Sequence, residues 1–270
     1  MSRNGGRDGR RKNHHAVIQY IMKLKIREIN ARSILSKSGI PGMNYCVNPY
    51  VGCAHACRYC YATFMMRFTG HTEPWGRFVD VKINAPELLR RQLRRAAKGS
   101  VMISSVTDAY QPLEKKYMIT RRCLEMVRLY QFPVSILTKS PLVVRDIDLI
   151  SELHDAEVGI TITSDNETTR KLFEPCAPPL SARIDALKIL HDAGIKTFVF
   201  IGPLLPMDPE SLAARIRPYA DNVLIDRMNY TNKTLGLYRK HGIEKWLDRD
   251  FVDRIVSRLK KGLRGHVEIL

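Results

Sequence analysis

The sequence predicts an α/β protein folded as an open partial (β/α)6 TIM-type barrel with parallel strands. Short β-branched runs recur along the chain, stretches of helical periodicity separate them, and these units number six, too few to close an eight-stranded barrel. A chain of 270 residues is long enough to bury a substantial core. In such a sheet, the chemistry is expected at the carboxyl ends of the strands.

The predicted strands are short apolar runs bounded by turn residues: Cys46–Val51, Val101–Val106, Val134–Thr138, Val158–Thr163, Thr197–Ile201 and Asn222–Asp226. Helices are predicted between them at Pro86–Lys98, Ile119–Tyr130, Asp146–Asp155, Ser181–Ala193 and Pro209–Tyr219, with a final helix at Phe251–Lys261. Proline suits the first helical turn at Pro86 and Pro209, where its missing N–H costs nothing. We therefore expect a basic leader at residues 1–21, predicted to be disordered, a barrel domain at 22–230 and a C-terminal helical extension at 231–270.

Positive charge is the most unusual feature of the composition. The 44 Lys and Arg residues exceed the 27 Asp and Glu residues by 17. Residues 1–32 account for seven of these charges, which leaves +10 for the rest of the chain. A second basic cluster, Arg90, Arg91, Arg94, Arg95 and Lys98, has helical spacing. This balance favours polyanionic partners, nucleic acid above all, although a solvated helix face is the simpler reading of the cluster alone.

The predicted cellular compartment depends on whether the sequence contains a membrane span or a secretory signal. The longest uncharged apolar stretch, Thr197–Met207, is far shorter than the ~18 residues that a membrane span needs. The N-terminal residues are basic but are not followed by the apolar region of a secretory signal. We expect a cytoplasmic protein with no membrane partner.

Three of the six cysteines lie within eight residues, directly after the first predicted strand. Cys53, Cys57 and Cys60 have the spacing Cys-x3-Cys-x2-Cys. Thiolates are soft ligands suited to zinc or to iron–sulfur clusters. Three thiolates on a 4Fe-4S cluster leave one iron open for chemistry, whereas a structural zinc site is closed by four ligands, for which Cys46 or His55 is a candidate.

The spacing, with the aromatic Tyr59 just before the last cysteine, resembles the signature of the radical S-adenosylmethionine (SAM) superfamily. Within that superfamily, four further segments resemble the spore photoproduct lyase-related group, whose members are often labelled DNA repair photolyases: TDAYQPLEKKYMITR, LTKSPLVVRD, TSDNETTRKLFEP and APPLSARIDALKILHDAGI. The resemblance covers about residues 43–229.

The resemblance implies a radical SAM enzyme, with a lyase as the reaction type that the group suggests. Its cofactors would be a 4Fe-4S cluster on Cys53, Cys57 and Cys60, and S-adenosyl-L-methionine, which is cleaved to a 5′-deoxyadenosyl radical after reduction by a donor such as flavodoxin or ferredoxin. It implies that SAM is bound by residues near the strand ends: Tyr59, Thr107, Asp108, Lys139, Thr161, Thr163, Glu174 and Arg183. Gln111 and Glu114 follow Asp108 and belong to the same candidate region.

Two positions depart from the group's pattern. Ser105 stands where spore photoproduct lyase has the cysteine that returns hydrogen to the substrate radical, and Cys176 stands where relatives commonly have arginine. An alcohol O–H bond is much stronger than a thiol S–H bond, so repair of spore photoproduct by the same route is not expected. Cys123 lies inside a helical pattern and is predicted to be a small buried side chain.

Three functions remain open at this point. The first is a radical SAM enzyme acting on nucleic acid, for example on a damaged base. The second is a radical SAM enzyme that modifies a peptide, a tRNA or a small metabolite. The third is a non-enzymatic zinc or iron–sulfur module that binds nucleic acid.

Overall fold

The computed structural model describes residues 24–263 and 266–270, so the predicted leader at residues 1–21 lies outside the described part. Its main feature is an eight-stranded sheet in the order β11-β10-β9-β8-β7-β6-β3-β2. All neighbouring strands in it are parallel except β2 and β3. The strands are β2 (Leu35–Lys37), β3 (Tyr45–Val47), β6 (Val101–Ile103), β7 (Val134–Thr138), β8 (Ala156–Thr161), β9 (Lys196–Ile201), β10 (Asn222–Ile225) and β11 (His266–Ile269). The predicted open, parallel α/β architecture is confirmed.

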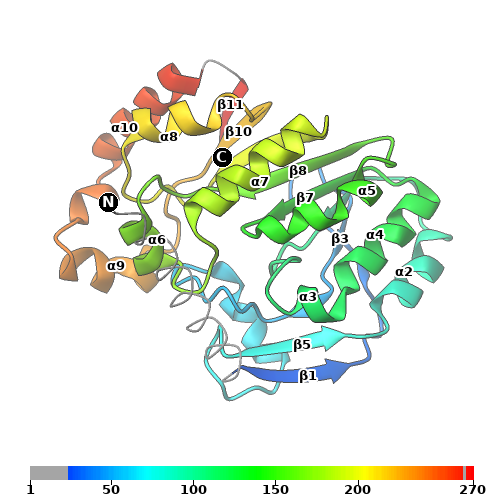
Figure 1. Cartoon of the computed structure of the whole chain (residues 1–270). Coiled ribbons are helices and arrows are strands. Elements are labelled where there is room, and N and C mark those ends of the chain that lie inside the picture. The colour runs from blue at the N-terminus through cyan, green and yellow to red at the C-terminus, as the bar shows by residue number, and fades with distance from the viewer. Residues whose placement is uncertain (1–23, 264–265) are drawn as a thin grey trace, which may run out of the picture.

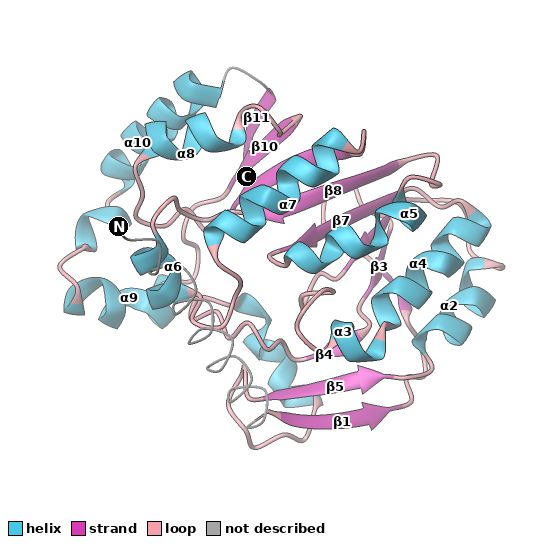
Figure 2. Ribbon diagram, in the orientation of Figure 1, coloured by secondary structure: helices cyan, strands magenta, loops and turns pink. Residues whose placement is uncertain are grey.

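Helices lie along the sheet, and Figures 1 and 2 show α4, α5 and α7 packed on one of its faces. The α-helices are α2 (Ala85–Leu93), α3 (Glu114–Tyr117), α4 (Ile119–Tyr130), α5 (Ile147–Ile150), α6 (Glu167–Phe173), α7 (Leu180–Asp192), α8 (Pro209–Ile216), α9 (Thr231–Lys240) and α10 (Arg249–Leu263). The 3-10 helices are η1 (Tyr61–Phe68), η2 (Pro141–Asp146) and η3 (Glu244–Leu247).

The two faces of the sheet are filled differently. On β8, Val158 and Ile160 belong to the main hydrophobic core, and Gly159 lies between them on the opposite face. A Cβ atom at Gly159 would lie 2.2 Å from the ring of Phe198, so the opposite face is closed here by an aromatic ring that only glycine accommodates.

The predicted first strand, Cys46–Val51, is wrong as a single element. It divides into β3 and β4 (Tyr50–Val51), because Pro49 has no N–H to continue a strand ladder. β4 pairs with β5 (Phe78–Lys82), which pairs with β1 (Lys25–Ile29), and together they form a separate three-stranded sheet that the sequence reading missed.

Several predicted elements end early. The strand predicted to Val106 ends at Ile103, because Ser104 adopts a left-handed backbone with φ of 69°. The helix predicted over Asp146–Asp155 is only η2 followed by the short α5, and the helix predicted to Tyr219 ends at Ile216.

The helix predicted over Pro86–Lys98 ends at Leu93, so Arg94, Arg95 and Lys98 of the basic cluster follow the helix instead of sharing a helical face. The chain leads from there into the start of β6. This part of the cluster therefore lies at the amino end of the parallel strands, opposite the edge where the chemistry is expected.

The C-terminal region contains α9, η3 and α10, and it also contains β11, which pairs with β10 and extends the main sheet. Within the described ranges, no helix combines the length and the apolar character required to cross a membrane.

Candidate functional site

The three clustered cysteines lie on the loop between β4 and η1. Gly52 starts this loop with φ of 86°, and a Cβ atom there would lie 2.4 Å from the carbonyl oxygen of Phe78. Glycine is thus required by both backbone conformation and space. The local sequence turns the chain sharply immediately before Cys53.

Residues after β6 hold this loop in place. Thr107 Oγ1 donates to the carbonyl oxygen of Gly52 at 2.6 Å. Gln111 accepts from the Ala54 N–H at 2.9 Å and donates to the Gly52 carbonyl at 3.3 Å. Two residues predicted near the cofactor are therefore seen positioning the cysteine loop.

Burial keeps the three thiols protonated. It raises the pKa of Cys57 to about 12, and it also raises the pKa values of Cys53 and Cys60. The positive charge of Lys139 opposes this effect at Cys57 and Cys60. A metal bound here has to displace these protons. Three soft sulfur donors beside a buried cation fit an anionic iron–sulfur cluster.

The candidates for a fourth ligand lie in different surroundings. Cys46 is buried on β3. The His55 side chain is buried, with Nε2 3.2 Å from Oδ2 of Asp108, although neither ring nitrogen is aligned for a hydrogen bond. In the described part of the chain, no three His, Cys, Asp or Glu side chains are grouped to hold a single metal ion. Cys123 is fully buried in α4, as predicted.

A buried carboxylate connects four of the predicted residues. Glu174 Oε1 accepts hydrogen bonds from the Tyr59 hydroxyl and, at 3.1 Å, from Thr163 Oγ1. Its Oε2 accepts from Arg183 at 2.5 Å, and its Oε1 lies 4.0 Å from the ammonium group of Lys139. Burial alone would raise the pKa of Glu174, but the charges of Arg183 and Lys139 lower it to about 2.

Arg183 is fully buried, and its guanidinium forms hydrogen bonds within this network. Besides Glu174, its guanidinium donates to the carbonyl oxygens of Pro178 and Thr161, at 3.0 and 3.1 Å. Thr161 and Thr163 are both buried and alternate with Ile160 and Ile162 of the core. The two threonines thus share one side of the chain at the end of β8, as their spacing indicates.

Lys139 is the predicted residue with unused bonding capacity. Its ammonium lies 4.0 Å from Glu174 and 5.7 Å from the ring centroid of Tyr59. It has no hydrogen-bond partner among the described residues. Burial would lower its pKa, but the nearby Cys57 and Glu174 raise it, so the ammonium stays charged. Lys139 can bind an anion beside the cysteine loop.

Asp108 joins the ends of β6 and β7. Its Oδ1 accepts from Thr138 Oγ1 at 2.6 Å and from the Tyr110 N–H at 2.9 Å, and its Oδ2 accepts from the Lys139 N–H at 2.9 Å. Burial opposes ionisation, yet the neighbouring His55 and these hydrogen bonds hold the pKa of Asp108 below its usual range. This carboxylate fixes the backbone that carries Lys139.

Glu114 lies in a different buried network. Its carboxylate accepts from the Tyr50 hydroxyl, from the Thr120 N–H at 3.0 Å and from Arg145 at 2.8 Å. With its oxygens shared among these donors, Glu114 supports the packing between α3, α4 and η2.

Sequence reasoning missed the contribution of α9. Lys233 donates to the carbonyl oxygen of Cys60 and to Thr63 Oγ1, each at 2.6 Å. Its positive charge lowers the pKa of Cys60 against the larger effect of burial. These residues are more than 160 positions apart in the sequence, so no local pattern signals the contact. The C-terminal region thus covers the end of the cysteine loop.

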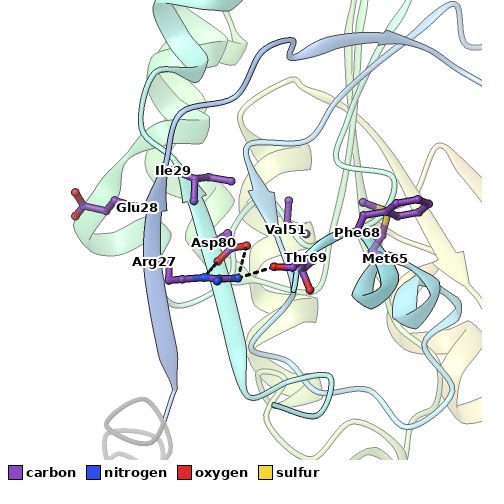
Figure 3. Close-up of a pocket in the computed structure, with 8 residues that line it drawn as sticks. All are labelled: Arg27, Glu28, Ile29, Val51, Met65, Phe68, Thr69 and Asp80. Atoms are coloured by element: carbon purple, nitrogen blue, oxygen red, sulfur yellow. Dashed lines mark hydrogen bonds and ion pairs between the residues drawn. The ribbon is translucent and has the colours of Figure 1, made fainter. Parts of the chain in front are cut away.

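A cavity of about 510 Å³ lies beside this loop, between the small sheet and η1 (Figure 3). Across it, Arg27 donates to Asp80 Oδ1 at 2.9 Å and to the Thr69 carbonyl at 2.8 Å. Met65 and Phe68 line its other side. None of the three cysteines or the predicted SAM-binding residues lines this cavity, so it is separate from the candidate site.

Comparison with known proteins gives consistent results. A family model described as the radical SAM superfamily matches residues 47–217. An uncharacterized protein of Methanocaldococcus jannaschii is 35% identical over 88% of this chain and 95% of that protein. An uncharacterized protein of Acidianus two-tailed virus is 33% identical over 82% of this chain and 81% of that protein.

Among solved structures, spore photoproduct lyase complexed with dinucleoside spore photoproduct superimposes with a TM-score of 0.67 at 12% identity. The alignment covers 94% of this chain and 84% of that one. At this identity, the likeness shows a shared fold.

Proposed function

This chain belongs to the radical SAM superfamily, and from that premise we propose that it reductively cleaves S-adenosylmethionine at a 4Fe-4S cluster and acts on nucleic acid. Cys53, Cys57 and Cys60 would hold the cluster. The observation that carries the proposal is the placement of Lys139 beside this three-thiol loop, with its ammonium 4.0 Å from Glu174 and without a hydrogen-bond partner among the described residues.

When bound, the cluster and SAM would supply radical chemistry for removing a hydrogen atom from a substrate. The residues of this chain bind and orient. Lys139 would receive the carboxylate of the methionine moiety. Glu174 and Arg183 hold Tyr59 against this site through the buried hydrogen bonds described above. The Cys53 side chain is buried and those of Cys57 and Cys60 are half-buried, which limits access of water to the site.

Two observations support nucleic acid as the substrate class. The chain carries a net charge of +17, and fixed positive charge attracts phosphates. A structure that shares its fold is a complex with a dinucleoside. Chemistry on a base requires an unpaired or flipped nucleotide.

Ser105 supports a reaction other than spore photoproduct repair. Its hydroxyl accepts from Asn48 Nδ2 at 3.2 Å, and its carbonyl accepts from the Tyr61 hydroxyl. Because an alcohol does not readily give up a hydrogen atom, Ser105 would not quench a substrate radical.

The proposal is tested by anaerobic reconstitution with iron and sulfide, followed by reduction in the presence of SAM. We expect iron and labile sulfide in the ratio of a 4Fe-4S cluster, and 5′-deoxyadenosine detected by chromatography. One tightly held zinc per chain and no 5′-deoxyadenosine would instead establish a structural metal module.

Replacing Lys233 with methionine is expected to leave the iron content unchanged and to lower the reduction potential of the cluster by tens of millivolts. The variant removes the ammonium group that donates to the Cys60 carbonyl, and a nearby positive charge favours the reduced, more negative cluster. Redox titration followed by electron paramagnetic resonance measures the shift. Lys240→Met is the matched control, because Lys240 is also exposed but lies at the other end of the same helix. Equal potentials for both variants and the wild type would refute a role for Lys233.

A further inference from the structure

Four exposed aromatic side chains gather beside the cysteine loop. They are Tyr61, Phe64 and Phe68 of η1 and Tyr230, which immediately precedes α9; their exposed fractions are 42%, 40%, 70% and 45%. A cluster of exposed aromatic rings indicates an interaction site for a ligand or a macromolecule. We refer to these four residues, with Arg67 and Lys233, as the aromatic surface.

Three of these four rings, those of Phe64, Tyr61 and Tyr230, are stacked in that order. The Tyr61 and Tyr230 centroids lie 6.1 Å apart with 18° between the ring planes, and those of Tyr61 and Phe64 lie 6.4 Å apart at 30°. The hydroxyl of Tyr61 donates to the carbonyl of Ser105, just after β6. The stack therefore runs from the catalytic edge of the main sheet to the molecular surface.

Two cations lie over these rings. The Arg67 guanidinium is 6.0 Å from the Phe64 centroid and 5.7 Å from that of Phe68, and the Lys233 ammonium is 5.3 Å from that of Tyr230. Neither cation forms an ion pair with an acidic residue in the described ranges. No carboxylate therefore neutralises either charge, although two of the three donors of Lys233 are used by the Cys60 carbonyl and Thr63.

Near-parallel aromatic faces interspersed with unpaired cations match the chemistry of single-stranded nucleic acid, whose bases stack on rings while its phosphates meet the cations. We propose that the aromatic surface binds unpaired nucleotides and leads one base to the site beside the cysteine loop. This inference rests on the proposed function and names where its substrate binds. The basic cluster after α2 does not serve this purpose, because it lies at the other end of the strands.

The position of Tyr230 makes the proposal testable without disturbing the loop. Tyr230→Leu removes one stacking face and keeps Lys233 in place. We expect it to weaken binding of a fluorescein-labelled twelve-residue oligothymidylate to the full-length protein roughly fivefold or more, measured by fluorescence anisotropy without SAM. Tyr230→Phe, which retains the ring, should bind within twofold of the wild type.

A matched control separates stacking from general aromatic content. Tyr219 also carries a lysine over its ring, with the Lys188 ammonium at 5.1 Å, but it follows α8 at the amino end of the strands. Tyr219→Leu should leave oligothymidylate binding unchanged. A phosphodiester chain without bases should bind the wild type and Tyr230→Leu equally, because only phosphate contacts remain.

The proposal is overturned if Tyr230→Leu binds oligothymidylate as tightly as the wild type. It is also overturned if this variant slows reduction of the cluster by flavodoxin while its oligonucleotide affinity is unchanged, since the surface would then dock a protein. Production of 5′-deoxyadenosine by the reduced wild type is assayed separately without oligonucleotide. If the wild type produced no 5′-deoxyadenosine, the proposed function would be contradicted, but the proposal that the aromatic surface binds unpaired nucleotides would not.

Discussion

Replacing Cys57 with alanine is expected to abolish cluster incorporation and all cleavage of SAM, while the α/β fold remains. Two thiolates cannot replace the three-thiol set, and Cys57 lies on a loop outside the strands of both sheets. Iron and sulfide analysis after anaerobic reconstitution, together with chromatography for 5′-deoxyadenosine, measures the loss. Circular dichroism of the metal-free protein should match that of the wild type.

Cys123→Ala is the appropriate control for this variant. Its thiol is fully buried, whereas Cys57 is half-buried, and it lies within α4 and packs in the main hydrophobic core. The control should bind iron as the wild type does, even if it unfolds somewhat more easily because a small cavity is left. SAM cleavage by Cys57→Ala at the wild-type rate would overturn the cluster assignment.

Replacing Glu174 with alanine is expected to lower the free energy of unfolding of the metal-free protein by about 3–5 kcal/mol, because the variant leaves the enclosed Arg183 without its counter-charge. Both side chains are fully buried, and their ion pair is 2.5 Å long. Urea denaturation measures the change. Removing a partner from such a pair is costly even where the pair itself contributes little to stability.

The control for Glu174 is an ion pair of the same length at the surface. Glu210 and Arg258 also approach to 2.5 Å, but both side chains are more than half exposed. Glu210→Ala should change the unfolding midpoint hardly at all, since solvent screens such pairs. Equal effects of the two substitutions would show that the Glu174 network does not stabilise the fold.

The lowered pKa of Glu174 predicts that the free energy of unfolding depends on pH in the acidic range. The pKa of Glu174 is about 2 in the folded chain and 4.5 in its ordinary state, so the unfolded chain binds more protons between these values. The stabilisation, on the order of 3 kcal/mol, is complete above pH 4.5 and is lost as the pH falls toward 2. Glu174→Gln should therefore show a shallower loss of stability over this interval.

Much of the fold follows from local pattern. The sequence predicts both ends of the strand Val134–Thr138 and of the helix Ile119–Tyr130 correctly. A run of β-branched residues and an apolar repeat of helical period each indicate which residues are buried. The small sheet was missed for the opposite reason. Its strands β1 and β5 are short and far apart in the chain, and only their pairing across more than 50 residues identifies them.

The candidate site divides in the same way. Spacing alone predicts Cys53, Cys57 and Cys60 as cluster ligands, and this prediction needs no distant partner because the three residues lie on one short loop. The predicted polar residues came from strand ends, and the structure separates them by environment. Asp108 and Arg183 each form three hydrogen bonds, whereas the Lys139 ammonium forms none with the described residues. Which donors remain free depends on neighbours that the sequence does not place.

The amino-acid sequence by itself determined the parallel α/β class, the three-cysteine loop and the family resemblance, because each depends on residues close together in the chain. Only the tertiary structure decided that Glu174 links Tyr59 to Arg183, that Lys233 bonds to Cys60 and that Tyr230 stacks on Tyr61. These contacts join segments that folding alone brings together, and their geometry is set by how α7 and α9 pack against the chain.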